Sequence, residues 1–272
     1  GSLIWESVFG FDIDGENQVY GLDNAYDLIL SNDGGYIITG QYHAQHPDIL
    51  ILKIDGQGNL ENKYNISTAP PSQRIIESGK SILTFNNNYI ILGSISQSSA
   101  DGPSNVWLSE YDVSLNDIGD TLWSKTWNLN TFDVPEKIIQ ISDGSFTFAG
   151  YSLNNSGELD FSWIINTDNT GNELSSIILS DGCYIYDFFE NIDGNYIVAG
   201  KKLIGDLFHG WISCIDFQGN QIWENTYGNE ESAKFQSVKQ TTDGGYILTG
   251  EDQLNGTTSI LHVKTDPTGN IN

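Results

Sequence analysis

Three carboxylates stand six or seven residues before a turn that recurs along the chain, namely Asp27, Glu136 and Asp187. Cleavage of a glycosidic bond uses two carboxyl groups a few ångströms apart, one as the acid and one as the base or nucleophile. These residues are therefore candidate catalytic groups of a glycoside hydrolase. Lys80 and Lys137 stand at matching positions and would neutralise them, so the main expectation is a site without catalysis.

Ligand binding is the second chemistry that these positions support. Counted six residues before the turn, one polar column comprises Asp27, Lys80, Lys137, Asp187 and Ser237. Its members either pair with one another along a wet central channel or bind a ligand at its mouth. Aromatic side chains anchor ligands well because they lose little entropy on binding. Packing within the loops is their alternative role, and the predicted aromatic contacts are Tyr26, Tyr42, Tyr151, Tyr186 and Phe208.

Calcium is the metal that the acidic residues suggest. Asp12, Asp14 and Glu16 have the spacing at which a calcium-binding loop begins, but the rest of that pattern is missing. An Asp-x-x-Gly-Asn pattern recurs elsewhere, and its Asp can accept backbone N–H bonds within a tight turn. Capping of the turn is therefore the favoured interpretation at Asp55, Asp168, Asp216 and Asp266. No cofactor is expected, with calcium at residues 12–16 as a weak alternative.

The elements that position these residues come from a repeat. The stretch from Asp33 to Gly40 recurs four more times, and its closing glycines at positions 40, 93, 150, 200 and 250 are 50 to 57 residues apart. A period near 50 built from short strands is typical of a propeller or a similar array. Asp-Gly marks a hairpin turn, and the β-branched and aromatic residues after it favour a strand.

Each repeat predicts four antiparallel strands, except that the last repeat lacks the fourth. Residues 3–10 match the fourth strand at residues 221–228, so we expect the N-terminal strand to complete the last blade and remove the exposed sheet edges. The prediction is an all-β, five-bladed β-propeller forming one domain over residues 1–272. Its blades are expected at about 20–66, 76–130, 133–180, 183–229, and 233–272 with 1–10.

Long, dissimilar connections are expected on one face of this propeller. Within the repeats they are predicted at 41–48, 94–105, 151–160, 201–209 and 251–258. A rigid scaffold that carries variable loops places binding on the loop side. The opposite face carries short turns, so the long-loop face is predicted to be the functional one.

Cys183 and Cys214 are expected to be free thiols. The predicted strands place them at opposite ends of one repeat, too far apart for the Cα separation of a disulfide. Cys214 is expected to be the more buried of the two, because it lies on an inner strand. The tryptophans of the third strands, Trp107, Trp163 and Trp211, are expected in the core.

The charge of the chain excludes several kinds of partner. Its 36 acidic and 11 basic residues give a formal charge of −25. Nucleic acid and anionic lipid are bound by clustered Lys and Arg, so neither is expected. No run of 18 apolar residues is present, so no membrane insertion is expected. The strong self-repulsion is consistent with a monomer.

The motifs Asp-Gly-Gly-Tyr-Ile-x-x-Gly, Ile-Leu-Lys-x-Asp-x-x-Gly-Asn and Ile-Trp-x-x-x-Tyr-Gly resemble the β-propeller repeats of bacterial and archaeal secreted and cell-surface proteins. The third repeat departs from them, because no Trp follows Asn172. The resemblance implies an extracellular or cell-surface location, with the leader absent from this sequence. It also implies a non-catalytic module that binds a glycan or a protein partner through the long-loop face. The alternatives are a polysaccharide-acting glycoside hydrolase and a spacer or assembly domain.

Overall fold

The computed structural model describes residues 2–9, 23–43, 47–67, 75–97, 102–112, 121–228 and 232–271. The described chain is all-β and contains 19 strands. It divides into two compact units, Gly1–Asp133 and Val134–Asn272, and the single domain expected from the repeats stays a prediction. No helix among the described residues is long and apolar enough to span a membrane. The proposed calcium residues Asp12, Asp14 and Glu16 lie outside the described part.

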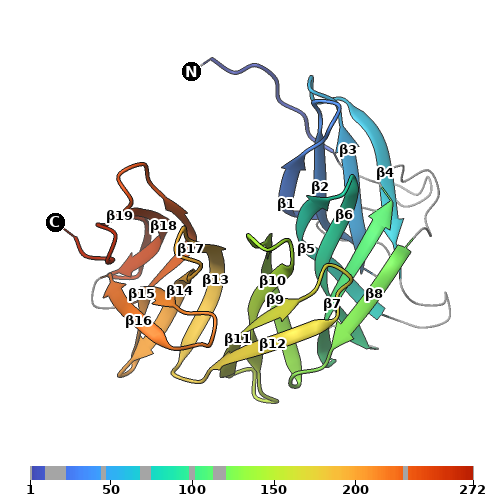
Figure 1. Cartoon of the computed structure of the whole chain (residues 1–272). Coiled ribbons are helices and arrows are strands. Elements are labelled where there is room, and N and C mark those ends of the chain that lie inside the picture. The colour runs from blue at the N-terminus through green and yellow to red at the C-terminus, as the bar shows by residue number, and fades with distance from the viewer. Residues whose placement is uncertain are drawn as a thin grey trace. The chain divides into compact units, whose positions relative to one another are not determined.

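The first unit contains two of the predicted repeats (Figure 1). The first is a sheet in the order β1 (Asn24–Leu30), β2 (Tyr36–His43), β3 (Pro47–Ile54) and β4 (Leu60–Ile66). The second comprises β5 (Ile75–Phe85), β6 (Asn88–Gln97), β7 (Ser104–Asp112) and β8 (Thr121–Trp127). The innermost strand β5 packs against β1, β2 and β3, so the two sheets stack face to face.

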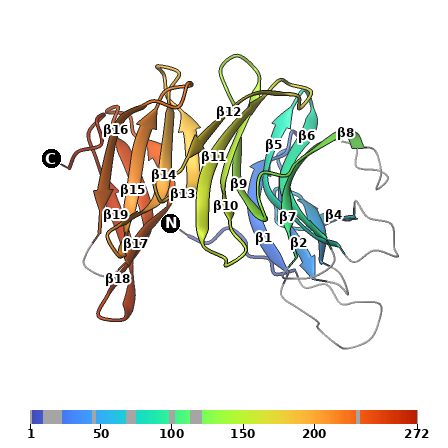
Figure 2. The same ribbon diagram turned by 90° about the horizontal axis from the view of Figure 1, so that it is seen from below.

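The second unit contains the remaining three repeats, which are also stacked (Figure 2). The third repeat of the chain comprises β9 (Phe132–Gln140), β10 (Phe146–Leu153), β11 (Leu159–Thr167) and β12 (Glu173–Leu179). The first two residues of β9 belong to the first unit. The fourth comprises β13 (Cys183–Glu190), β14 (Tyr196–Ile204), β15 (Leu207–Ile215) and β16 (Gln221–Tyr227). The fifth has only β17 (Ser232–Gln240), β18 (Tyr246–Leu254) and β19 (Thr257–Lys264).

The closing glycine of each repeat has a steric cause. A Cβ atom on Gly40, Gly93, Gly150, Gly200 or Gly250 would collide with a backbone carbonyl oxygen of the neighbouring inner strand. In the hairpins whose strand register is defined, the inner strand has a β-bulge one or two residues after the one that supplies this carbonyl, as between Ile185 and Asp187. Only a residue without a side chain admits the carbonyl, which explains the recurrence of glycine at the end of the motif.

The Asp-x-x-Gly-Asn turns are capped by their own aspartates. Asp55 Oδ1 accepts the backbone N–H groups of Gln57 and Asn59, both at 2.8 Å, and Oδ2 accepts the Asn59 amide at 2.8 Å. Asp168, Asp216 and Asp266 each accept the same pair of backbone bonds. The Asn172 side-chain amide, together with these backbone bonds, holds the pKa of Asp168 well below its usual range. The carboxylates are thus occupied by the turns, as the capping interpretation predicts.

The predicted core is confirmed, with one error in the ranking of the cysteines. Trp107, Trp163 and Trp211 are all buried. Both cysteines are free. Cys183 has no exposed surface whereas Cys214 is 3% exposed, so the expectation that Cys214 would be more buried is wrong. Cys183 begins β13 and packs in the core cluster that includes Ile164.

The N-terminal segment lies against the first repeat in the way that a fourth strand lies against the next repeat. The Trp5 indole donates to Gly56 O at 3.1 Å, and the Ser7 hydroxyl donates to Gly58 O at 2.7 Å. The Trp5 ring also lies so close to Gly58 that a Cβ atom there would overlap it. Residues 2–9 nevertheless form no strand.

The equivalent contact in the second unit is made by β16. Trp223 covers Gly269, Asn225 donates to Thr268 O at 3.1 Å, and the Tyr227 hydroxyl donates to Gly269 O. Among the described strands none pairs with the outer edge of β19, where Ile260 is 79% exposed. The five-bladed count with N-terminal closure stays a prediction.

Two of the expected long loops are wrong. In the fourth repeat β14 and β15 are joined by Gly205 and Asp206 alone, and in the fifth β18 and β19 are joined by Asn255 and Gly256. Gly205, Asn255 and Gly256 adopt positive φ, which two-residue hairpin turns require. The strands therefore extend through most of the segments that were expected to be loops.

Candidate functional site

Four aromatic rings gather in the second unit, and we call them the aromatic cluster: Tyr151, Tyr184, Tyr186 and Phe208. Tyr151 lies edge-on to Tyr184, with ring centroids 4.9 Å apart, and to Tyr186 at 6.0 Å. Tyr184 stacks on Tyr186 at 6.2 Å and meets Phe208 edge-on at 5.6 Å. These are the stacked and edge-to-face arrangements that aromatic side chains prefer.

Strand alternation explains how the cluster forms. At the start of β13 the buried residues Cys183 and Ile185 alternate with the half-buried Tyr184 and Tyr186, up to the bulge between Ile185 and Asp187. Successive side chains of a strand point to opposite faces, so both tyrosines share one face. Tyr151 comes from the end of β10 and Phe208 from the start of β15. The cluster thus lies at the strand ends beside two of the predicted long connections, 151–160 and 201–209.

Lys201 closes one side of the aromatic cluster. It lies directly across the hairpin from Tyr184. Its Nζ is 4.2 Å from the centroid of the Tyr184 ring and 4.1 Å from that of Phe208. Burial lowers the pKa of Lys201, and the nearby Lys234 lowers it further while Glu251 opposes this. The ammonium group is therefore held against two ring faces rather than in bulk water.

Two carboxylates accompany the tyrosines. Burial raises the pKa of Tyr186 above its ordinary value, and Tyr151, Glu136 and Glu251 contribute to the rise. Burial also raises the pKa of Tyr151, again with a contribution from Glu136. Both phenols therefore stay protonated at neutral pH, where they can donate hydrogen bonds. Glu251 pairs with Lys234 across β17 and β18, with the charged atoms 3.0 Å apart.

Several predicted site residues meet here. Glu136, Tyr151, Tyr186 and Phe208 all belong to this neighbourhood, whereas sequence reasoning missed Tyr184, Lys201 and Glu251. The Tyr-Ile-Tyr alternation at 184–186 was the signal for Tyr184. Nothing local distinguished Lys201, because its ring partners come from two other strands. Lys137 follows Glu136 on β9 and is half-buried.

Asp187 is engaged in a structural role. Its Oδ1 accepts the Phe188 N–H at 3.0 Å, and its Oδ2 accepts the Ser237 hydroxyl and the Val238 N–H, both at 2.9 Å. The side chain is only 6% exposed. It thereby connects the inner strand of the fourth repeat to that of the fifth. At this position the members of the polar column pair with each other, which was one of the two roles expected for them.

Asp27 makes the same connection in the first unit. Its Oδ2 accepts the Ser81 hydroxyl at 2.7 Å and the Ile82 N–H at 3.1 Å, and its Oδ1 accepts the Leu28 N–H at 3.0 Å. A carboxylate with both oxygens occupied by backbone and hydroxyl donors is poorly placed to transfer protons to a substrate. Two of the three candidate catalytic carboxylates thus serve the junctions between repeats.

The alignment of Lys80 with Asp27 is off by one residue. Five residues separate the paired Leu30 and Tyr36 in the first repeat, but only four separate Thr84 and Tyr89 in the second. The shorter turn moves Ser81 into the position of Asp27 and Lys80 into that of Tyr26. Lys80 Nζ lies 3.9 Å from the centroid of the Tyr26 ring.

Tyr42 is buried in the first unit rather than offered to a ligand. It is 7% exposed and packs with Leu50 and Leu52. The Lys63 ammonium lies 3.7 Å from the centroid of its ring. Loop packing is therefore the better description of Tyr42. Among the described residues no group of three or more His, Cys, Asp or Glu side chains is arranged to hold a metal ion.

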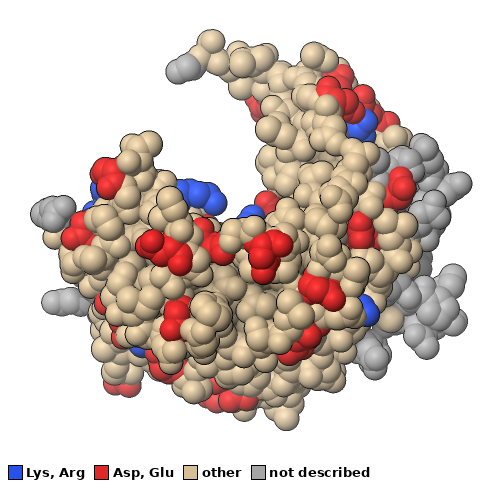
Figure 3. Space-filling view, viewed as in Figure 1, with Lys and Arg blue, Asp and Glu red and all other residues tan. Residues whose placement is uncertain are grey.

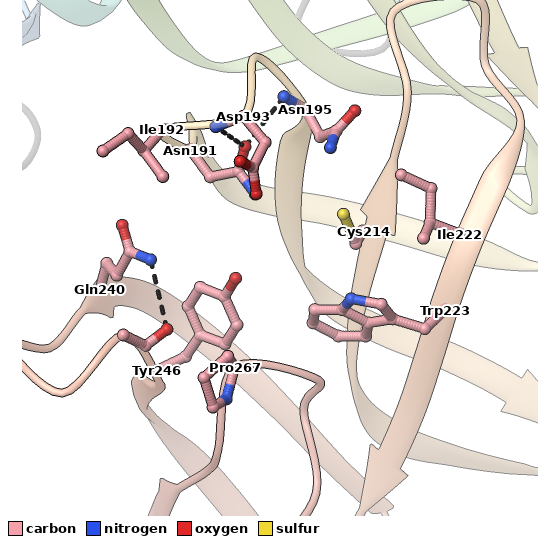
Figure 4. A pocket seen from close by; sticks show the side chains of 11 residues that line it. Asn191, Ile192, Asp193, Asn195, Cys214, Ile222, Trp223, Gln240, Tyr246 and Pro267 are labelled. Carbon is pink, nitrogen blue, oxygen red and sulfur yellow. Dashed lines mark hydrogen bonds between the residues drawn. The ribbon is translucent and has the colours of Figure 1, made fainter.

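A pocket of about 310 Å³ opens at the other end of the second unit, beside the short turns (Figure 4). Trp223 and Tyr246 form one wall, with ring centroids 5.8 Å apart. Asn191 Oδ1 is already occupied by the N–H groups of Asp193 and Asn195. Burial raises the pKa of the Cys214 thiol in this pocket to about 11, so the thiol is not a nucleophile at neutral pH. The pocket offers less chemistry than the aromatic cluster.

No family model matches this chain, and no curated protein does. Its fold is similar to those of solved structures at low sequence identity. One is an endo-arabinase of Bacteroides thetaiotaomicron, at 8% identity and a TM-score of 0.51, covering 90% of this chain and 94% of the enzyme. Another is an exo-β-1,3-galactanase of Phanerochaete chrysosporium solved with β-1,3-galactotriose, at 10% identity and a TM-score of 0.54. That match covers 89% of this chain and 60% of the galactanase.

These two structures correct the expected function. The repeat architecture was taken to indicate a non-catalytic binding module, yet both neighbours with this fold are enzymes named for cleaving glycans. The repeat architecture is therefore no argument against catalysis, and the expectation of a module without activity is overturned. At these identities the likeness establishes the all-β fold alone.

Proposed function

We propose that this chain is a glycan-cleaving enzyme of the glycoside hydrolase type, with its active site at the aromatic cluster of the second unit. The observation that carries the proposal is the aromatic cluster, whose rings meet at centroid distances of 4.9 to 6.2 Å. Glu251 is held by its ion pair with Lys234, and both Glu136 and Glu251 contribute to the raised pKa of Tyr186. Two carboxylates beside a stacking surface are what hydrolysis of a glycosidic bond requires. The glycan-cleaving enzymes that share the fold support the same reaction class.

Roles follow from the surroundings of each carboxylate. Glu136 contributes to the raised pKa of the half-buried Tyr151 and Tyr186, and we assign it as the acid. Glu251 is held in an ion pair by Lys234, and we assign it as the base or nucleophile. The half-buried rings of the aromatic cluster would contact the apolar face of a sugar unit beside Lys201, which already lies against Tyr184 and Phe208. Asp27 and Asp187 are left out, because both oxygens of each accept hydrogen bonds at junctions between repeats.

The proposal includes the closed five-bladed ring. Trp5 and Ser7 hold the N-terminal segment on the turn at 55–59 as Trp223 and Asn225 hold β16 on the turn at 266–270. A segment that occupies a fourth-strand position beside the first repeat is the natural partner for β19, whose repeat lacks that strand. Polysaccharides do not cross membranes, so we also propose an extracellular or cell-surface location.

Release of reducing sugar from a panel of plant and microbial polysaccharides tests the activity. We expect Glu136→Gln and Glu251→Gln each to reduce turnover by about 100-fold or more, the usual loss when an acid or base is removed. The exposed Asp206 in the β14–β15 turn supplies a matched control, and Asp206→Asn should retain full activity. Wild-type protein that cleaves none of the panel, or turnover unchanged in both glutamate variants, would refute the proposal.

A further inference from the structure

Lys201 is a half-buried lysine of an acidic chain whose ammonium group lies against two aromatic rings. The chain has 36 acidic and 11 basic residues, and acidic side chains predominate on the face drawn in Figure 3. Lys53, Lys202, Lys234 and Lys264 each form at least one ion pair. Within the described part of the chain, no carboxylate lies at ion-pair distance from the half-buried Lys201.

The ammonium group of Lys201 keeps its hydrogen-bonding capacity. A lysine ammonium carries three N–H donors and no acceptor, and no oxygen of the described residues accepts a hydrogen bond from Lys201. The two ring faces of Tyr184 and Phe208 attract its charge but accept none of these N–H groups in a conventional hydrogen bond, so the donors of the half-buried side chain are available to solvent or to a ligand. Glu251 does not compensate it directly, because its carboxylate pairs with Lys234 at 3.0 Å.

The surroundings of Lys201 favour an incoming anion. Burial and Lys234 both disfavour the charged form of Lys201, and a carboxylate placed beside the ammonium would restore the interactions that burial removes. The half-buried rings of the aromatic cluster beside it offer apolar surface that a sugar ring can contact. One partner with a carboxylate on a sugar ring satisfies both features.

We propose that Lys201, with Tyr184 and Phe208, binds the carboxylate of an acidic sugar unit, so that the substrate is a polysaccharide containing uronic acid. This inference rests on the proposed function and adds the substrate class. The sugar ring lies on the aromatic cluster while its carboxylate accepts hydrogen bonds from the Lys201 ammonium. A neutral sugar makes the first contact but not the second.

The net charge of −25 sets a condition for this binding. The overall field of the protein repels a polyanion, but at physiological ionic strength charges are screened over about 8 Å. The contact with Lys201 acts within that distance, whereas repulsion from the rest of the surface does not. Affinity for an acidic oligosaccharide should therefore rise or stay level as salt increases from low to physiological levels, the opposite of binding to a basic groove.

Calorimetric titration with oligosaccharides of equal length tests the inference without requiring turnover. The probes are oligogalacturonate, oligoglucuronate, a sulfated neutral oligosaccharide and an unmodified neutral one. We expect Lys201→Met to weaken uronate binding about tenfold or more, the range of a lost hydrogen bond to a charged group. Binding of the neutral oligosaccharide should change less than about twofold. Lys239→Met, at an exposed lysine of β17, is the matched control and should bind as wild type does.

Lys201→Gln, which preserves more of the polarity at this position, gives a second reading should the methionine variant fold poorly. Wild-type protein that binds neither uronate, or uronate binding unchanged in both Lys201 variants, would overturn the inference. Binding of the sulfated probe alone would also overturn it. Cleavage of neutral glycans without uronate binding would refute the proposed acidic subsite but not the proposed hydrolase activity. Lys201-dependent uronate binding without cleavage of any glycan would refute the hydrolase activity but not the acidic subsite.

Discussion

Replacement of Asp187 by alanine separates a structural aspartate from a catalytic one. The substitution leaves the N–H groups of Phe188 and Val238 without their acceptor, together with the Ser237 hydroxyl. The site is closed to water, since Asp187 is 6% exposed and Val238 1% exposed. A buried donor without a partner costs about 1–3 kcal/mol. The hydroxyl can rotate to another acceptor, so the two amides dominate, and the expected loss in the free energy of unfolding is about 4 kcal/mol.

Thermal and urea unfolding followed by circular dichroism measure this loss. For a chain of this size 1 kcal/mol lowers the melting temperature by about 2–4 °C, so the midpoint should fall by about 8–16 °C. Asp27→Ala is the internal comparison, because Asp27 has the same partners in the first unit but is half-exposed. Water can replace its carboxylate there, and about 1 kcal/mol is expected.

A melting temperature of Asp187→Ala within about 2 °C of wild type would refute the structural role. Loss of glycan cleavage in Asp187→Asn at unchanged stability would go further and return Asp187 to the active site. The carboxylate would then be needed for its proton or its charge rather than for the donors that it accepts.

Four further outcomes are expected. Gly200→Ala should lower stability by about 1–3 kcal/mol, since the new Cβ collides with Tyr184 O; an unchanged melting curve would contradict the glycine argument. Native protein at pH 8 should react slowly with a thiol reagent, whereas denatured protein should show two thiols, because burial raises the pKa of Cys183 well above its usual range and that of Cys214 to about 11. The raised pKa of Cys214 contributes stability below pH 9.0 that is lost as pH rises toward 11. Fast labelling of the native state would show these thiols to be accessible. The ion pair with Lys53 and neighbouring hydrogen bonds lower the pKa of Asp33 from 3.8 to about 2. The contribution of Asp33 to stability is therefore present above pH 3.8 and falls as pH drops toward 2, and this part of the pH dependence of the urea midpoint should be absent in Asp33→Asn. Parallel pH profiles for variant and wild type would argue against it. Deletion of residues 1–10 should cause aggregation or a large loss of stability, because Trp5 and Ser7 cover the turn at 55–59 and β19 needs a partner; a monomer with unchanged melting in sedimentation and thermal assays would refute N-terminal closure.

The repeat pattern predicted most strands and turns of this chain, because their causes are local. It missed the β14–β15 and β18–β19 hairpins, and residues 2–9 form no strand. Asp-Gly and Asp-x-x-Gly-Asn specify turns through backbone φ and through hydrogen bonds to a residue two or four positions away. The alternation of buried and half-buried residues on β13 is a property of any strand with one covered face. The free cysteines followed from the same strand geometry, although their relative burial did not.

The tertiary structure decided what the side chains do. Asp27 and Asp187 were prominent in the sequence as paired carboxylates, but their hydrogen-bond partners lie in the next repeat. Asp27 is 55 residues from Ile82, and Asp187 is 50 residues from Ser237. A turn one residue shorter in the second repeat moved Lys80 out of their column. No local pattern encodes either result, because each depends on how one sheet stacks on the next.

The candidate site depends on the same long-range packing. Its rings come from β10, β13 and β15 and its charges from β9, β14, β17 and β18, so spacing along the chain says little about their distances. The sequence alone determined the all-β repeat, its turns and the aromatic residues available at the connection side. Only the stacked sheets decided that Tyr184, Tyr186 and Phe208 form one surface, with Lys201 held above it and two carboxylates beside it.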